Sequence, residues 1–202
     1  MKAIIFNGAM ERSPESTGGI LSGYLAEKLR EFDVQSRIFN LADSGIPLFD
    51  VSITKTPQPV ELMNQMFLEA DIHFWLAPLY HGSIPGAMKN CLDWLEVSAK
   101  NPSPYLTDKM VGMVCWADGL QAMQGINTMD AVAKALRAWT LPFSIPIVRD
   151  SLFEKEFPKE ISPVYRDKLD LLIKLATTKK IESRETQPKW RDKCDLFQKI
   201  KV

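Results

Sequence analysis

Short apolar runs of strand length alternate along this chain with stretches of helical periodicity, and that alternation is typical of strand–helix units forming a parallel sheet. Five such runs can be placed, at residues 2–7, 34–41, 72–78, 110–116 and 143–148. The first, third and fourth are almost continuously apolar, as parallel strands covered by helices on both faces must be. We therefore predict an α/β fold with these three strands in the centre of the sheet.

The second and fifth runs have the composition of edge strands. Gln35, Ser36, Arg37 and Asn40 interrupt the second run, and the fifth contains Pro146, which cannot donate a ladder hydrogen bond. Right-handed crossovers and these edge positions leave 2-1-3-4-5 as the strand order. The predicted fold is thus a flavodoxin-like three-layer sandwich with a five-stranded parallel sheet.

Between these runs, apolar residues recur three and four positions apart and predict four amphipathic helices. A fifth helix is expected to begin with Ser162 as N-cap and Pro163 at the first helical position. We expect the apolar faces, including their methionines and aromatic residues, to form the core. The four faces consist of Leu21, Tyr24, Leu25 and Leu29; Met63, Met66, Phe67 and Ala70; Met88, Cys91, Leu92 and Leu95; and Met129, Val132, Ala133 and Leu136.

The length of 202 residues suits one compact domain, which we place at residues 1–182, with a C-terminal extension at 183–202. That extension either folds over a neighbour or partner subunit or is a solvated end. Twenty-five basic and twenty-five acidic side chains cancel, so no overall field favours nucleic acid or an anionic membrane.

Cysteine usage and the amino terminus point to a soluble cytoplasmic protein. Cys91, Cys115 and Cys194 are odd in number and lack C-x-x-C spacing, so we expect reduced thiols and no metal site. Residues 1–7 lack the features of a signal peptide, and no apolar run reaches the length of a membrane span.

In a sheet of this order, ligands bind beyond the carboxyl ends of the strands, where the strand order reverses. That point lies between the first and third strands. Residues 8–17 follow the first strand and supply hydroxyls, a guanidinium and a helix N-terminus, an inventory that suits a phosphate. In the alternative interpretation, Ser16 or Thr17 only caps the helix. The loop matches neither the Walker pattern nor G-x-G-x-x-G.

The segment after the third strand carries a specific resemblance. Residues 78–93 read PLYHGSIPGAMKNCLD, which resembles the P-x-Y-N-x-S-x-P-G-x-L-K-N-x-L-D segment of the NAD(P)H-dependent FMN reductase family. The likeness runs from the first strand to about residue 148. Among members, the chain is most similar to flavin reductases that supply sulfonate monooxygenases, with quinone, azo-dye and chromate reductases as relatives.

The resemblance implies a role for each of the loops that follow the first, third and fourth predicted strands. The first would hold the FMN phosphate, and the other two would hold the isoalloxazine ring, largely through backbone groups. The implied phosphate residues are Arg12, Ser13, Ser16 and Thr17; those along one edge of the ring are Pro78, Leu79, Tyr80, His81, Gly82 and Ser83; those beneath its pyrimidine side are Ala117, Asp118 and Gly119.

The first loop departs from the family pattern G-S-x-R-x-x-S. Ala9 replaces its serine, Glu11 stands in the arginine column, and Arg12 is displaced by one position. A carboxylate facing a phosphate would oppose binding, so Glu11 and Glu15 are expected to point to solvent unless the site is altered. In the second loop, His81 stands where asparagine is usual.

The remaining polar residues leave alternatives open. His73 is interpreted as a hydrogen-bonded core residue rather than a catalytic one, whereas His81 lies where it could contact the flavin. Lys89 and Asp93 are spaced as an ordinary helix ion pair, although the resemblance implies an intersubunit alternative. Core packing is expected for Trp94 and Trp116.

By this resemblance, the chain is an FMN-dependent oxidoreductase. It would transfer a hydride from NADPH or NADH to bound FMN and pass electrons to free flavin, a quinone, an azo compound or a metal oxyanion. No catalytic side chain is expected, because the cofactor carries the chemistry. The alternatives are a flavodoxin-like electron carrier and a scaffold that has lost flavin binding. Related reductases imply a homodimer or homotetramer.

Overall fold

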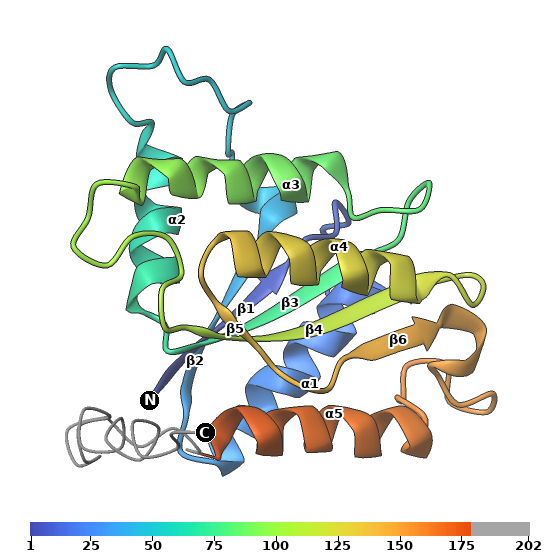
Figure 1. Cartoon of the computed structure of the whole chain (residues 1–202). Coiled ribbons are helices and arrows are strands. Elements are labelled where there is room, and N and C mark those ends of the chain that lie inside the picture. The colour runs from blue at the N-terminus through green and yellow to red at the C-terminus, as the bar shows by residue number, and fades with distance from the viewer. Residues whose placement is uncertain (179–202) are drawn as a thin grey trace, which may run out of the picture.

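The computed structural model describes residues 1–178, so the predicted boundary at 182, the extension and Cys194 lie outside the described residues. Strands and helices alternate along this part of the chain (Figure 1). The strands are β1 (Lys2–Asn7), β2 (Gln35–Asn40), β3 (Ile72–Pro78), β4 (Met110–Ala117), β5 (Trp139–Thr140) and β6 (Ile145–Val148). The helices are α1 (Thr17–Glu31), α2 (Gln58–Glu69), α3 (Gly86–Asp93), α4 (Ala122–Ala135) and α5 (Pro163–Thr177).

The sheet has the order β2-β1-β3-β4-β5, and every pairing in it is parallel. This confirms the predicted flavodoxin-like strand order. All seven residues of β3 are buried, whereas β2 is mostly exposed, as expected for a central and an edge strand.

Helices α1 and α5 cover one face of the sheet, and α2, α3 and α4 cover the other (Figure 1). Successive residues of β3 point to opposite faces: Phe74 packs with α1 and α5, and Trp75 packs with α2, α3 and α4. The predicted apolar faces of the helices form these two cores, with Tyr24, Met66, Val132 and Leu136 only partly buried. Within the described residues, no helix is long and apolar enough to span a membrane.

The fifth strand was predicted wrongly as one segment at 143–148. Two shorter segments, β5 and β6, both pair with β4 at this edge. The N–H of Leu141 still donates to the carbonyl of Val111 at 2.9 Å, but Pro142 has no N–H and interrupts the ladder. Pairing resumes at Ile145, opposite Val114. The interrupted edge is the consequence of proline in an outer strand.

The fifth helix begins at Pro163, as predicted, and Ser162 occupies its N-cap position. The Ser162 side chain does not cap the helix. Its hydroxyl instead donates to the carbonyl oxygen of Ser151 at 3.0 Å, which ties the start of α5 to the chain leaving β6.

Helix α3 holds the long connection between β2 and α2. Asn90 accepts a hydrogen bond from the N–H of Phe49 at 2.7 Å and donates to the carbonyl of Pro47 at 2.9 Å. The buried Trp94 donates to the same carbonyl at 2.8 Å, and its ring meets that of Phe49 edge to face. Trp94 and Trp116 are both core residues, as predicted. Lys89 and Asp93 form the predicted ion pair on the solvent side of α3.

His73 lies in the centre of the sheet and is fully buried. Its Nε2 is 3.0 Å from the carbonyl oxygen of Phe67, and its ring packs edge to face on the Phe67 ring. This confirms a hydrogen-bonded core histidine. Burial lowers the pKa of His73 to about 3, because the charged ring would lose its hydration.

Stability should therefore fall as the pH drops below about 6.5. The unfolded chain binds a proton at His73 with an ordinary pKa, whereas the folded chain resists protonation until about pH 3. From this residue alone, we expect a loss of about 2 kcal/mol in the free energy of unfolding between pH 7 and pH 5. Urea titrations at half-unit intervals of pH measure it, and His73→Gln should flatten the slope. Equal slopes in the two proteins would contradict this assignment.

Candidate functional site

The loops that follow β1, β3 and β4 all lie at the carboxyl edge of the sheet. Strand β1 pairs with β2 on one side and β3 on the other, so the strand order reverses there. The chain leaves β1 towards α1 on one face of the sheet, and leaves β3 towards α3 on the other (Figure 1). The backbone also joins these loops, because Gly8 N–H donates to Leu76 and Leu79 N–H donates to Trp116, both at 2.8 Å.

Asn7, the last residue of β1, organises the first loop. Its side chain is buried, donates to Asn40 Oδ1 at 3.2 Å and accepts from the N–H of Ala9 at 3.2 Å. A Cβ on Gly18 would stand 2.5 Å from the Asn7 side-chain oxygen. Glycine at this position therefore lets the first turn of α1 sit directly over the end of β1.

The N-terminus of α1 presents an anion-binding arrangement of amides. Ser16 is its N-cap, because its hydroxyl oxygen accepts from the N–H of Gly19 at 3.2 Å and its carbonyl accepts from Ile20. Ser16 therefore caps the helix, which leaves its implied phosphate contact a prediction. The two remaining first-turn amides belong to Thr17 and Gly18, and such amides lack acceptors within their own helix. They carry the positive end of the helix dipole.

The other two implied phosphate residues face neighbouring protein groups. Arg12 donates through Nε and Nη2 to the carbonyl oxygen of Ala42, at 3.3 and 3.1 Å, and its Nε lies 3.2 Å from Asp43 Oδ1. Ser13 accepts at its hydroxyl from the N–H of Glu15 at 3.2 Å. The first loop is thus held in shape by its own polar contacts and by the loop after β2.

Tyr80, His81, Gly82 and Ser83 form a tight turn after β3. Tyr80 and Ser83 exchange both backbone hydrogen bonds, at 2.9 and 3.0 Å. Both central residues have positive φ, 49° for His81 and 81° for Gly82, which is the type I′ arrangement. Asparagine and histidine tolerate this backbone better than most side chains. Histidine can therefore replace the family's asparagine at position 81 and still form the turn.

The turn lies exposed beside the start of α4. Gln124 of α4 lies next to Gly82, because its Oε1 would be 3.2 Å from a Cβ added there. Tyr80 is 47% exposed, and Pro78 at the end of β3 is buried. Backbone groups and one exposed aromatic ring are therefore what this loop offers to a flat ligand.

The third loop begins where β4 ends. Ala117 is buried, Asp118 is exposed and Gly119 is half-buried. The Asp118 carboxylate pairs with Arg149 at 3.2 Å, in the short helical turn that follows β6. Leu120 next to it is 88% exposed.

A second ion pair links the first loop to the connection between β6 and α5. Lys159 Nζ lies 2.6 Å from Glu15, so Glu15 does not face a phosphate position unpaired. Glu11 is exposed to solvent. Both carboxylates are therefore exposed to solvent, and Glu15 is also paired.

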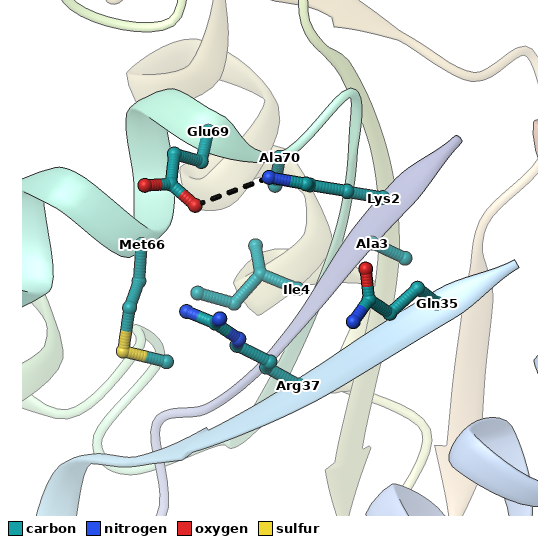
Figure 2. A pocket seen from close by; sticks show the side chains of 8 residues that line it. All are labelled: Lys2, Ala3, Ile4, Gln35, Arg37, Met66, Glu69 and Ala70. Atoms are coloured by element: carbon teal, nitrogen blue, oxygen red, sulfur yellow. Dashed lines mark hydrogen bonds and ion pairs between the residues drawn. The ribbon is translucent and has the colours of Figure 1, made fainter.

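Three hollows are described, and the first of them adjoins the connection that Lys159 ties to the first loop. One of about 620 Å³ is formed by the connection after β6, between Asp150 and Glu160. Another of about 440 Å³ lies between α1 and β2. Figure 2 shows a third, of about 20 Å³, where Lys2 pairs with Glu69 at the amino edge of the sheet. Hollows at the amino edge are on the wrong side for a strand-switch ligand.

The two described cysteines are buried and are not reactive thiols. The thiol of Cys115, on β4, is buried, which raises its pKa to about 12 and keeps it protonated. Cys91 is also a buried free thiol. Among residues 1–178, no three His, Cys, Asp or Glu side chains gather in a way that could hold a metal ion.

Sequence reasoning missed the residues that shape these loops. Asn7 could have been found, because it is the one polar residue that ends an otherwise apolar strand. Asp43, Arg149 and Lys159 left no such signal, because each is an ordinary charged residue in a connection far along the chain from its partner.

The backbone groups at this edge of the sheet are of the kind that FMN needs. The α1 amides provide an anion site, and the positive-φ turn and the loop after β4 provide backbone edges on the other side of the strand switch. Of the implied phosphate residues, Ser16 and Thr17 lie at the helix terminus, Ser13 lies beside it, and Arg12 is turned towards Asp43. The implied ring residues gather around the turn and the end of β4.

Comparison with known proteins agrees with this geometry. A family model for NADPH-dependent FMN reductase matches residues 1–150. The FMN-dependent NADPH-azoreductase of Staphylococcus aureus is 26% identical over 160 residues, covering 77% of this chain and 80% of the relative.

Solved structures share the fold at lower identity. The flavoenzyme NAD(P)H:(acceptor) oxidoreductase of Paracoccus denitrificans superposes with a TM-score of 0.68 at 14% identity, over 87% of this chain and 94% of that one. An azoreductase of Bacillus anthracis superposes with a TM-score of 0.60 at 14% identity, over 87% and 98%.

The family match covers residues 1–150 and confirms the resemblance that runs from the first strand to about residue 148. It makes the chain an oxidoreductase enzyme that uses FMN with NAD(P)H. By its sequence from residue 1 to residue 150 and by its strand order, the chain belongs to the NADPH-dependent FMN reductase family.

Proposed function

We propose that FMN binds with its phosphate at the N-terminus of α1 and its ring against the loops after β3 and β4. The observation that carries this proposal is the meeting of three loops at the strand switch, where one offers helix amides and two offer backbone edges. When bound, FMN supplies the hydride acceptor that this chain's own side chains lack.

The protein's own groups would bind and orient the FMN. Thr17 and Gly18 amides bind the phosphate, with the Ser16 cap keeping the first turn of α1 in place. The type I′ turn fixes the Tyr80 backbone, and the Leu79–Trp116 hydrogen bond holds that turn against the end of β4. Because these loops are exposed, nicotinamide and then a second acceptor, such as a free flavin, quinone, azo compound or metal oxyanion, would approach the bound ring from solvent.

The first test is binding. We expect FMN to bind the purified protein with micromolar or tighter affinity, measured by quenching of flavin fluorescence. The FMN affinity of Glu11→Arg, compared with that of the wild type, measures what the loop has lost by its departure from the family pattern, because the variant restores the arginine of that pattern. A colourless protein that leaves flavin fluorescence unchanged would contradict the proposal. A large gain in Glu11→Arg alone would favour a scaffold that has lost flavin binding.

The second test concerns the reaction. The proposed enzyme releases oxidised nicotinamide before the acceptor binds, so double-reciprocal plots of NADPH against a benzoquinone should give parallel lines. Fast reduction by NADPH without a partner reductase also separates an enzyme from an electron carrier. Intersecting lines would indicate a ternary complex instead.

We further propose that two copies associate over the carboxyl edge. Leu120 is 88% exposed, and Met123 and Tyr80 are each nearly half exposed around the same loops, which supports an interface there. Light scattering at micromolar concentration should give at least twice the mass of one chain, and Leu120→Ser should lower it. A strict monomer would count against this assembly.

A further inference from the structure

Arg12 is the one arginine in the loop after β1, and its guanidinium group contacts the connection after β2. It is held by the short helical turn after β2, Leu41–Asp43, through the Ala42 carbonyl and the Asp43 carboxylate. The Nε–Oδ1 distance to Asp43 is 3.2 Å. Asp43 therefore pairs with the one guanidinium that the loop after β1 supplies.

The Arg12–Asp43 ion pair is weak enough for a stronger anion to replace Asp43. The Arg12 side chain is 77% exposed and that of Asp43 is 54% exposed, so water screens their attraction and the pair contributes little. A phosphate monoester carries nearly two negative charges near neutral pH and can accept two parallel hydrogen bonds from a guanidinium. It is therefore a stronger partner for Arg12 than a single exposed carboxylate.

We propose that Asp43 is a positioning residue that competes with the flavin phosphate for Arg12. On binding, Arg12 leaves Asp43 and joins the α1 amides around the phosphate, so the exchange sets how strongly the protein distinguishes FMN from riboflavin. This inference rests on the proposed flavin site and adds to it the residue that tunes its selectivity.

Asp43→Asn is the direct test, because it removes the charge while keeping the size and a hydrogen-bond acceptor. We expect the Kd for FMN to fall about twofold to fivefold, the range available from one exposed ion pair. The Kd for riboflavin, which has no phosphate, should not change. Both are measured by flavin fluorescence quenching at low ionic strength, and the FMN effect should shrink as salt rises.

A double-mutant cycle separates competition from simple repulsion. If Asp43 acts through Arg12, Asp43→Asn in an Arg12→Gln background should leave FMN affinity unchanged. If it acts by general repulsion of the phosphate, the gain should persist in that background. Glu69→Gln is the matched control, since Glu69 also pairs with an exposed cation, Lys2, at the opposite edge of the sheet (Figure 2).

Three results would overturn the inference: no gain in FMN affinity in Asp43→Asn, an equal gain for riboflavin, or an equal gain without Arg12. Each of these can occur while the wild-type protein binds FMN well, and then the proposed flavin site stands. If the wild-type protein binds neither FMN nor riboflavin, the proposed site and the role of Asp43 fail together.

Discussion

The parallel pairing of β1 with both β2 and β3 is the constraint on which the rest of this structure depends. Because both partners run parallel to β1, each connection must cross over the sheet, and the right-handed crossovers place α1 and α3 on opposite faces. The loop after β1 leads into α1 and the loop after β3 leads into α3, so these two loops separate at the carboxyl edge between the two strands. Any ligand that needs an anion site on one side and a flat backbone edge on the other is placed there by topology.

Side chains then refine what the topology provides. Asn7 is buried at the end of β1. Its side chain hydrogen-bonds Asn40 at the end of β2 and Ala9 in the first loop, and it packs closely against Gly18 of α1. The loops are further joined by exposed ion pairs, Arg12 with Asp43, Glu15 with Lys159, and Asp118 with Arg149. The backbone thus gives the site its shape, and weak surface charges adjust it.

The sequence was a good guide wherever burial or backbone conformation decided the outcome. The continuous apolar runs of β1, β3 and β4 predicted central strands, because polar side chains there would lose hydration. The interruption at Pro142 was foreseeable in kind but not in position, since a proline can end, shift or divide an edge strand. The pairing of Arg12 with Asp43 could not be predicted, because alternative exposed ion pairs differ little in free energy and the two residues lie on different connections.

The most direct test of the central claim is hydrogen–deuterium exchange with FMN and with riboflavin, followed segment by segment. FMN should protect the first turn of α1, at Thr17–Gly19, together with residues 79–83 and 117–119. Riboflavin should protect the second and third segments and leave α1 unchanged, because it lacks the phosphate. Protection confined to the hollows after β6 or beside β2, or equal protection of α1 by both flavins, would contradict this account.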